Sequence, residues 1–278
     1  MLRVIANHRR GVRTWVMALL VAVLIGGAAV AAGPAAAAAT PKPTVVLVHG
    51  SYADASSWSA VTRSLQERGY PVIAAANPLR GVSIDSAYLQ DLLAQIKGPI
   101  VLVGHSYGGF VMTNAATGNP NVKALVYIAA FAPAQGETLQ QLISRAPGSL
   151  LAPSAIDVET YRTPDGQLAP EGTIKPSAFR RIFAADVPAS LTKVVAASQR
   201  PTALSTLTDP SGPPAWTTIP SWYMVAGADK AVGAANERFM AQRIHATTVE
   251  ARGASHVVII SRPHKVVRLI VDAATGRR

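Results

Sequence analysis

Short runs of β-branched and other apolar residues alternate along the chain with longer stretches of helical period. The first pattern is typical of strands buried on both faces of a sheet, and the second of helices with one apolar face. We expect strands at residues 44–48, 71–75, 100–103, 124–128, 222–226 and 247–250. We expect helices at residues 56–68, 85–97, 107–117, 235–244 and 262–273. This alternation predicts an α/β fold in which helices flank a mostly parallel sheet of about six strands.

The alternation stops between about residues 134 and 215, where Pro, Ser and Thr become more frequent. Turn-forming sequences such as Pro147-Gly148 and Pro164-Asp165-Gly166 divide this segment. Short helices are expected inside it at residues 137–145, 177–184 and 188–198. We therefore predict a helical cap insertion that covers the carboxyl edge of the sheet, where open α/β sheets bind ligands.

The first 39 residues have the order of a secretory signal peptide. Arginines without any acidic residue precede an apolar core at residues 15–25, and an alanine-rich tail follows. Small residues at 37–39 suit cleavage, which predicts an exported, extracellular domain at residues 40–278. A retained membrane anchor is the alternative, because residues 15–32 are long enough to span a bilayer if slightly stretched.

The composition excludes several classes of function. The 278 residues carry a formal net charge of +11, but beyond the leader the Lys and Arg residues are scattered. The clustered basic stripe that nucleic-acid binding requires is therefore missing. The chain has no Cys, which excludes disulfides and thiol catalysis, and its six His residues lack metal-ligand spacing. We accordingly expect no metal and no other cofactor.

The motif Gly104-His105-Ser106-Tyr107-Gly108 lies between an expected strand and an expected helix. A turn this tight holds its serine in a strained backbone conformation. Side chains at positions 104 and 108 would collide with neighbouring backbone, and glycine at both positions removes the clash. The strand before the motif and the helix after it predict that Ser106 is a nucleophile.

A serine nucleophile needs a general base and a group that orients that base. His256 follows the last expected strand, and Asp229 follows the strand at residues 222–226. Both are therefore expected at the same carboxyl edge as Ser106. Asp209 and Asp186 are rival acids, but each falls inside the predicted insertion and follows no strand.

The remaining parts of such a site are donors for a developing oxyanion and a pocket for the substrate. The expected donors are the backbone N–H groups of Tyr107, after the nucleophile, and of Ser51, after the first strand. Aromatic side chains near this edge are candidates for an apolar acyl pocket, and packing within the insertion is the alternative. The candidates for substrate binding are Tyr52, Phe179, Phe183 and Trp216, and Tyr161 lies in the same insertion.

Together these features resemble the α/β-hydrolase fold, over residues 44–273. The closer likeness is to the small six-stranded branch that includes plant methyl esterases, hydroxynitrile lyases and bacterial relatives. The stretches that carry it are Val-Leu-Val-His49-Gly50, Asn77-Pro-Leu-Arg-Gly81 and Gly104-His-Ser-Tyr-Gly-Gly109. The resemblance implies Ser106 as nucleophile, Asp229 as acid, His256 as base, and the amides of Ser51 and Tyr107 as oxyanion donors.

Two positions distinguish the chemistries of that branch. The lyases that the chain resembles keep a lysine directly after the triad histidine and a threonine where this chain has Gly50. Here the residue after His256 is Val257. The resemblance therefore implies hydrolysis of a small-molecule ester through an acyl-enzyme. A lyase or perhydrolase variant that uses the same triad, and a catalytically weak ligand-binding protein on the same fold, are the alternatives.

Overall fold

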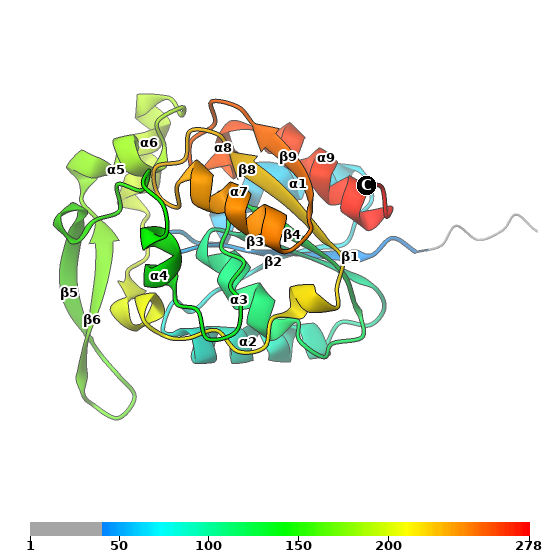
Figure 1. Cartoon of the computed structure of the whole chain (residues 1–278), viewed down its shortest axis with the longest axis horizontal. Coiled ribbons are helices and arrows are strands. Elements are labelled where there is room, and N and C mark those ends of the chain that lie inside the picture. The colour runs from blue at the N-terminus through cyan, green and yellow to red at the C-terminus, as the bar shows by residue number, and fades with distance from the viewer. Residues whose placement is uncertain (1–40) are drawn as a thin grey trace, which may run out of the picture. The chain divides into compact units, whose positions relative to one another are not determined.

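The computed structural model describes residues 41–278 (Figure 1). The predicted leader at residues 1–39 lies outside the described residues. Between residues 41 and 278, no helix is both long enough and apolar enough to cross a membrane.

A parallel sheet of six strands forms the centre of this part of the chain, which confirms the predicted fold class (Figure 1). Its order is β2-β1-β3-β4-β8-β9. The strands are β1 Thr44–Val48, β2 Val72–Ala75, β3 Ile100–His105, β4 Val122–Ile128, β8 Ser221–Ala226 and β9 Thr247–Ala251. The direction of winding reverses between β1 and β3, which pair side by side. Open α/β sheets bind ligands outside the carboxyl ends of the strands at such a switch point.

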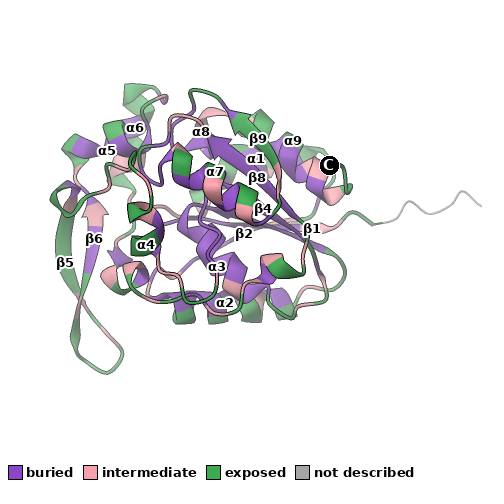
Figure 2. Cartoon of the chain, viewed as in Figure 1, coloured by how far each residue is buried: buried purple, intermediate pink, exposed green. Residues whose placement is uncertain are grey.

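Helices cover both faces of the sheet (Figure 1). One face is covered by α2 Val82–Ala94, α3 Tyr107–Ala115 and α7 Ala234–Arg243. The other is covered by α1 Ser59–Glu67, α8 Val258–Ser261 and α9 Pro263–Ala274. Successive strand residues alternate between the two cores, so that Val46 packs on one face and Leu47 on the other. Burial on both faces explains why the strands are unbroken apolar runs (Figure 2).

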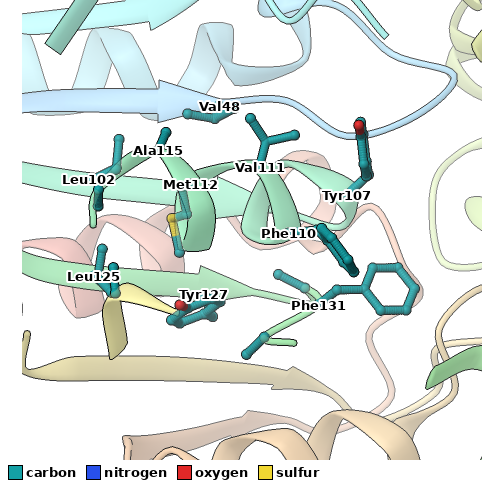
Figure 3. Packing of buried hydrophobic residues seen from close by; sticks show 14 of the residues in the cluster. Val48, Leu102, Tyr107, Phe110, Val111, Met112, Ala115, Leu125, Tyr127 and Phe131 are labelled. Atoms are coloured by element: carbon teal, nitrogen blue, oxygen red, sulfur yellow. The ribbon is translucent and has the colours of Figure 1, made fainter. Parts of the chain in front are cut away.

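Helix α3 is buried on every side except at Asn114. Its residues Phe110, Val111 and Met112 lie in one packed cluster with side chains of the central strands (Figure 3). A helix that is apolar all round is stable only when it is enclosed. Its enclosure fixes the position of the turn that precedes it.

The segment between β4 and β8 contains the predicted short helices, at positions a few residues from those expected. They are α4 Leu139–Ser144, α5 Pro176–Phe183 and α6 Ala189–Ala197. The segment also contains a second sheet, which the sequence analysis does not predict, built from β5 Ile156–Arg162, β6 Leu168–Ile174 and β7 Thr202–Ala203. The described residues also form the 3₁₀ helices η1 Ala55–Trp58, η2 Pro153–Ala155, η3 Leu204–Leu207 and η4 Ala215–Thr217.

Strand β5 is mostly exposed to solvent, whereas the second half of β6 is buried or half-buried (Figure 2). A strand such as β5, without a buried face, needs no regular apolar alternation, so its sequence shows little of the usual strand pattern. The turn sequence Pro164-Asp165-Gly166 between two runs containing β-branched residues was the available signal for it.

Candidate active site

Ser106 occupies the turn from β3 into α3 with φ 54° and ψ −126°. Residues other than glycine rarely adopt positive φ, and such strain persists only where the surroundings hold it in place. Here the N–H of Ser106 donates to the carbonyl of Ile128, and its carbonyl accepts from the N–H groups of Gly109 and Phe131, at 3.0 to 3.3 Å. Main-chain bonds on both sides therefore hold the serine in its strained conformation.

The two glycines that flank Ser106 are required by close backbone contacts. A Cβ atom on Gly104 would lie 2.6 Å from the main-chain nitrogen of Gly109. A Cβ atom on Gly108 would lie 2.3 Å from the carbonyl oxygen of Val48 in β1. Both distances are far inside van der Waals contact, in agreement with the steric reason expected from the motif.

The substitution Gly108→Ala is expected to lower the free energy of unfolding by more than about 3 kcal/mol. Overpacking usually costs about 1–3 kcal/mol, and here the added methyl group meets the backbone of a central strand that cannot yield. Urea unfolding measures the loss. Gly212→Ala is the matched control, because its nearest atom is the side-chain oxygen of Asn114 at 3.2 Å, and we expect a change below about 1 kcal/mol. Equal stability of Gly108→Ala and the unsubstituted chain would contradict this packing.

His256 and Asp229 form a side-chain pair that is closed to solvent, with 2.6 Å between Nδ1 and Oδ2. Asp229 follows β8 and His256 follows β9, as predicted. The other carboxylate oxygen, Oδ1, accepts the N–H groups of Ala231 at 2.6 Å and Val232 at 2.9 Å. Burial acts to raise the pKa of Asp229, but His256 and the neighbouring hydrogen bonds outweigh it and lower that pKa to about 2. The carboxylate is thus ionised, and because it can only accept, Nδ1 of His256 carries the proton.

The second ring nitrogen of His256, Nε2, is buried and has no hydrogen-bond partner among residues 41–278. The ring packs against those of Phe183, with 4.5 Å between centroids, and His105, with 4.7 Å. His105 directly precedes Ser106, and its Nε2 donates to the main-chain carbonyl of His256 at 3.0 Å. Burial, and then the proximity of His256, lower the pKa of His105 to about 3, so this ring is neutral. The hydrogen bond from His105 therefore links the serine turn to the loop that carries His256.

The loop after β1 passes directly over Ser106. A Cβ atom on Gly50 would lie 2.6 Å from the Cβ of Ser106 and 3.2 Å from its Oγ. Behind the loop, Nε2 of His49 accepts the N–H of Asn77, and the Asn77 amide donates to the His49 carbonyl, both at 3.0 Å. These bonds hold the loop backbone against the serine, where only glycine fits.

Ser51 and Tyr107, the two expected oxyanion donors, line the same cavity as Ser106. The Tyr107 hydroxyl donates to Asp85 at 2.8 Å within the core. Burial raises the pKa of that hydroxyl well above its ordinary value, so it keeps its proton. The structure therefore places both backbone segments beside the serine, and their role as donors stays a prediction.

The cavity lies between the serine turn and the insertion, with a volume of about 20 Å³. That volume holds about one water molecule. Apart from a few hydroxyl groups its lining is apolar, and none of the lining residues carries a charge. His256 is fully buried and is not among the residues that line the cavity, whereas Phe183, whose ring packs against that of His256, is.

Of the four aromatic candidates for substrate binding, two line the cavity and two do not. Tyr52 and Phe183 line the cavity. Phe179 does not line it. Its ring packs against that of Phe183 in the core of the insertion, with 5.2 Å between the ring centroids. Trp216 also lies away from it, with its indole N–H donating to the carbonyl of Pro133 at 2.7 Å.

The other candidates from the insertion have contacts of their own. Tyr161 lies on β5 with its ring 4.3 Å from the guanidinium carbon of Arg80. Of the rival acids, Asp186 accepts the hydroxyl of Ser255, and Asp209 accepts a main-chain N–H at the start of α2 at 3.0 Å. His256 pairs with Asp229 rather than with either of them.

Several lining residues were missed by the sequence analysis. They are Phe131, Leu139, Ile143, Leu151, Thr202, Ala203, Leu204, Thr206, Leu207, Ala231 and Val232. Phe131 had a signal, because it follows a strand of the central sheet as Ser106 does. Most of the others belong to the insertion, whose fold the apolar pattern does not determine. Within the part of the chain that the structure describes, no group of three or more His, Asp or Glu side chains could hold a metal ion.

The family model described as the alpha/beta hydrolase family matches residues 45–269. A carbendazim hydrolyzing esterase from Nocardioides sp. is 31% identical over 114 residues, which are 36% of this chain and 47% of that protein. The match thus spans about half the length of that relative. A pyrethroid hydrolase from Sphingobium wenxiniae is 25% identical over 248 residues, which are 83% of this chain and 87% of that protein.

Solved structures resemble the whole described fold. Polyneuridine aldehyde esterase has a TM-score of 0.71 at 20% identity, covering 83% of this chain and 98% of its own. A methylesterase from Arabidopsis has a TM-score of 0.69 at 17% identity, covering 84% and 99%. At these identities the likeness concerns the fold.

Proposed function

The chain belongs to the alpha/beta hydrolase family, and on that premise we propose that it is a serine esterase that cleaves small, uncharged carboxylic esters. The observation that carries this proposal is the buried pair of His256 and Asp229. Nε2 of His256 has no hydrogen-bond partner among the described residues, and the loop that carries this histidine is hydrogen-bonded to the turn that holds Ser106 in its strained conformation. Relatives named as an esterase and a hydrolase support the same class of reaction.

In the proposed reaction, the Oγ of Ser106 attacks the ester carbonyl carbon while Nε2 of His256 takes its proton. The carbonyl electron pair moves onto oxygen, and the N–H groups of Ser51 and Tyr107 stabilise the resulting oxyanion. When the carbonyl re-forms, the alcohol leaves with the proton from His256, and the acyl group stays on the serine. Water then repeats the sequence and releases the acid. The low pKa of Asp229 keeps its carboxylate ionised throughout.

Two features support hydrolysis over the carbon–carbon cleavage of the related lyases. The residue after His256 is Val257, whose buried side chain packs in the insertion and whose N–H donates to the carbonyl of Phe183 at 3.1 Å. No ammonium group stands there to stabilise a departing anion. At the other position, a side chain on residue 50 would crowd Ser106, as the distances from Gly50 indicate.

The lining of the cavity supports an uncharged substrate. A carboxylate moved from water into an apolar site without a partner loses several kcal/mol of solvation, and no cationic side chain lines this cavity. Because the cavity holds about one water molecule, binding of an ester requires some of the residues that line it to move apart.

A matched pair of esters tests the proposal. We expect the chain to hydrolyse p-nitrophenyl hexanoate with a kcat/KM at least about tenfold higher than that for mono-p-nitrophenyl adipate, which has the same chain length and a terminal carboxylate. Release of p-nitrophenol, corrected for spontaneous hydrolysis, measures both. Equal efficiencies would contradict the preference for uncharged esters. Hydrolysis of neither ester, nor of shorter and aromatic analogues, would contradict the esterase and favour the ligand-binding alternative.

A further inference from the structure

A second buried carboxyl group lies beside the proposed triad, and no step of the reaction above uses it. Glu237 is in the first turn of α7 and is fully buried. Its Oε2 accepts the N–H of Ala226, the last residue of β8, at 2.8 Å. No N–H or O–H group of the described residues donates to the other oxygen, Oε1. The carboxyl group of Glu237 lies near that of Asp229, because the same residue, Ala226, donates its N–H to Glu237 and accepts the main-chain N–H of Asp229 at 3.0 Å, and each carboxyl shifts the pKa of the other.

When two buried carboxyl groups lie this close together, the charge of one disfavours ionisation of the other unless a cation is nearby. The titratable and charged groups that act on Glu237 are Asp229, Tyr223 and Arg238. Arg238 is exposed and pairs with Glu250 at 2.7 Å, and the Tyr223 hydroxyl donates to a main-chain carbonyl. Burial first, and then Asp229, raise the pKa of Glu237 well above its usual range. Since Asp229 is ionised, Glu237 is the carboxyl that keeps its proton.

We propose that Glu237 is a positioning residue of the triad: its neutral carboxyl donates a hydrogen bond from Oε1 to Asp229 and holds that carboxylate against Nδ1 of His256. Oε2 already accepts a main-chain N–H, which leaves Oε1 to carry the proton. The Asp229 carboxylate then receives hydrogen bonds from His256, from the loop amides and from α7. The part of the proposal that concerns catalysis rests on the esterase function proposed above.

Two substitutions separate the hydrogen bond from mere packing. In Glu237→Gln the amide oxygen can accept the N–H of Ala226 while the amide N–H donates to Asp229, so we expect kcat within about threefold of the unsubstituted chain. Glu237→Leu has similar bulk and no donor, and we expect kcat to fall about 10- to 100-fold with KM changed by less than about threefold. An unchanged kcat in Glu237→Leu, or an equal loss in both variants, would overturn the positioning role.

A stability measurement tests the proton on Glu237 without any turnover. A carboxyl that is neutral when folded and ionised when unfolded stabilises the fold fully below its unfolded pKa of about 4.3. That contribution is lost as pH rises toward the raised pKa of the folded state. Above about pH 5, the urea-unfolding stability of the unsubstituted chain should therefore fall more steeply than that of Glu237→Gln, by up to the equivalent of one proton.

Glu250→Gln is the matched control for this measurement, because it replaces an exposed acid whose pKa is lowered by Arg238. It should reproduce the slope of the unsubstituted chain. Parallel curves for the unsubstituted chain and Glu237→Gln would overturn the proposal. A difference of one proton in a chain that hydrolyses no ester would support a protonated Glu237 and contradict the esterase, so the two failures are distinguishable.

Discussion

Replacing Ser106 with alanine is expected to lower kcat/KM for p-nitrophenyl hexanoate by about 10⁶-fold. The substitution removes the only atom that forms the acyl bond, and what remains is the slower attack of water assisted by the oxyanion donors. Alanine keeps the Cβ of serine, so the strained backbone at φ 54° meets no new clash. The free energy of unfolding should change by less than about 1 kcal/mol. Steady-state kinetics and urea unfolding together separate a chemical loss from a folding loss.

A fluorophosphonate probe gives a covalent measure of the same role. Attack of Oγ on phosphorus expels fluoride, so the unsubstituted chain should gain one phosphonyl group on the peptide that contains Ser106. Ser106→Ala should gain none. Ser59→Ala, which changes an exposed serine of α1, should be labelled and active like the unsubstituted chain. Labelling or near-normal turnover in Ser106→Ala would remove the basis for a serine mechanism.

The central sheet and the serine turn could be predicted because their causes are mostly local. Residues of β1 such as Val46 and Leu47 are fully buried on opposite faces, so the strand appears in the sequence as an unbroken apolar run. Gly104 is required by contacts with Gly108 and Gly109 in the same turn, whereas Gly108 is required by its contact with the end of β1, which is distant in the sequence. Parallel strands then bring Asp229 and His256 to one edge, because each directly follows a strand.

The lining of the cavity could not be predicted, because it depends on how the insertion packs. Phe179 and Phe183 are four residues apart and lie on the same face of α5, and both are buried. Only the tertiary placement of that helix brings one ring to the cavity and puts the other behind it. Exposed residues of the hairpin, such as Val158, have no apolar partner that would produce a periodic pattern.

Glu237 was missed for a related reason. It lies between polar residues in Asn236-Glu237-Arg238, and a charged residue in the first turn of a helix normally faces water. Its burial follows from the contact of α7 with β8, which the pattern of α7 itself does not reveal. A role for such a buried acid can be inferred only once the structure shows which carboxylate lies beside it.

Replacing Asp229 with asparagine is expected to lower kcat by about 10⁴-fold while KM changes by less than about threefold. The backbone determines which way the new amide points. Two N–H groups, of Ala231 and Val232, donate to Oδ1, so the amide oxygen must take that place and its NH₂ group must face His256. Nδ1 of His256 can then only accept, which moves the ring proton to Nε2. An imidazole with its proton on Nε2 cannot take the proton of Ser106.

The rival acid supplies the control for this prediction. Asp186 accepts the hydroxyl of Ser255, next to His256, but makes no bond to the imidazole, so Asp186→Asn should lower kcat by less than about tenfold. Nitrogen-15 chemical shifts of the His256 ring report which nitrogen is protonated. We expect the proton on Nδ1 in the unsubstituted chain and in Asp186→Asn, and on Nε2 in Asp229→Asn alone. A large loss in Asp186→Asn with little change in Asp229→Asn would transfer the role of triad acid to Asp186. An unchanged tautomer in Asp229→Asn would contradict the orientation that the loop amides impose.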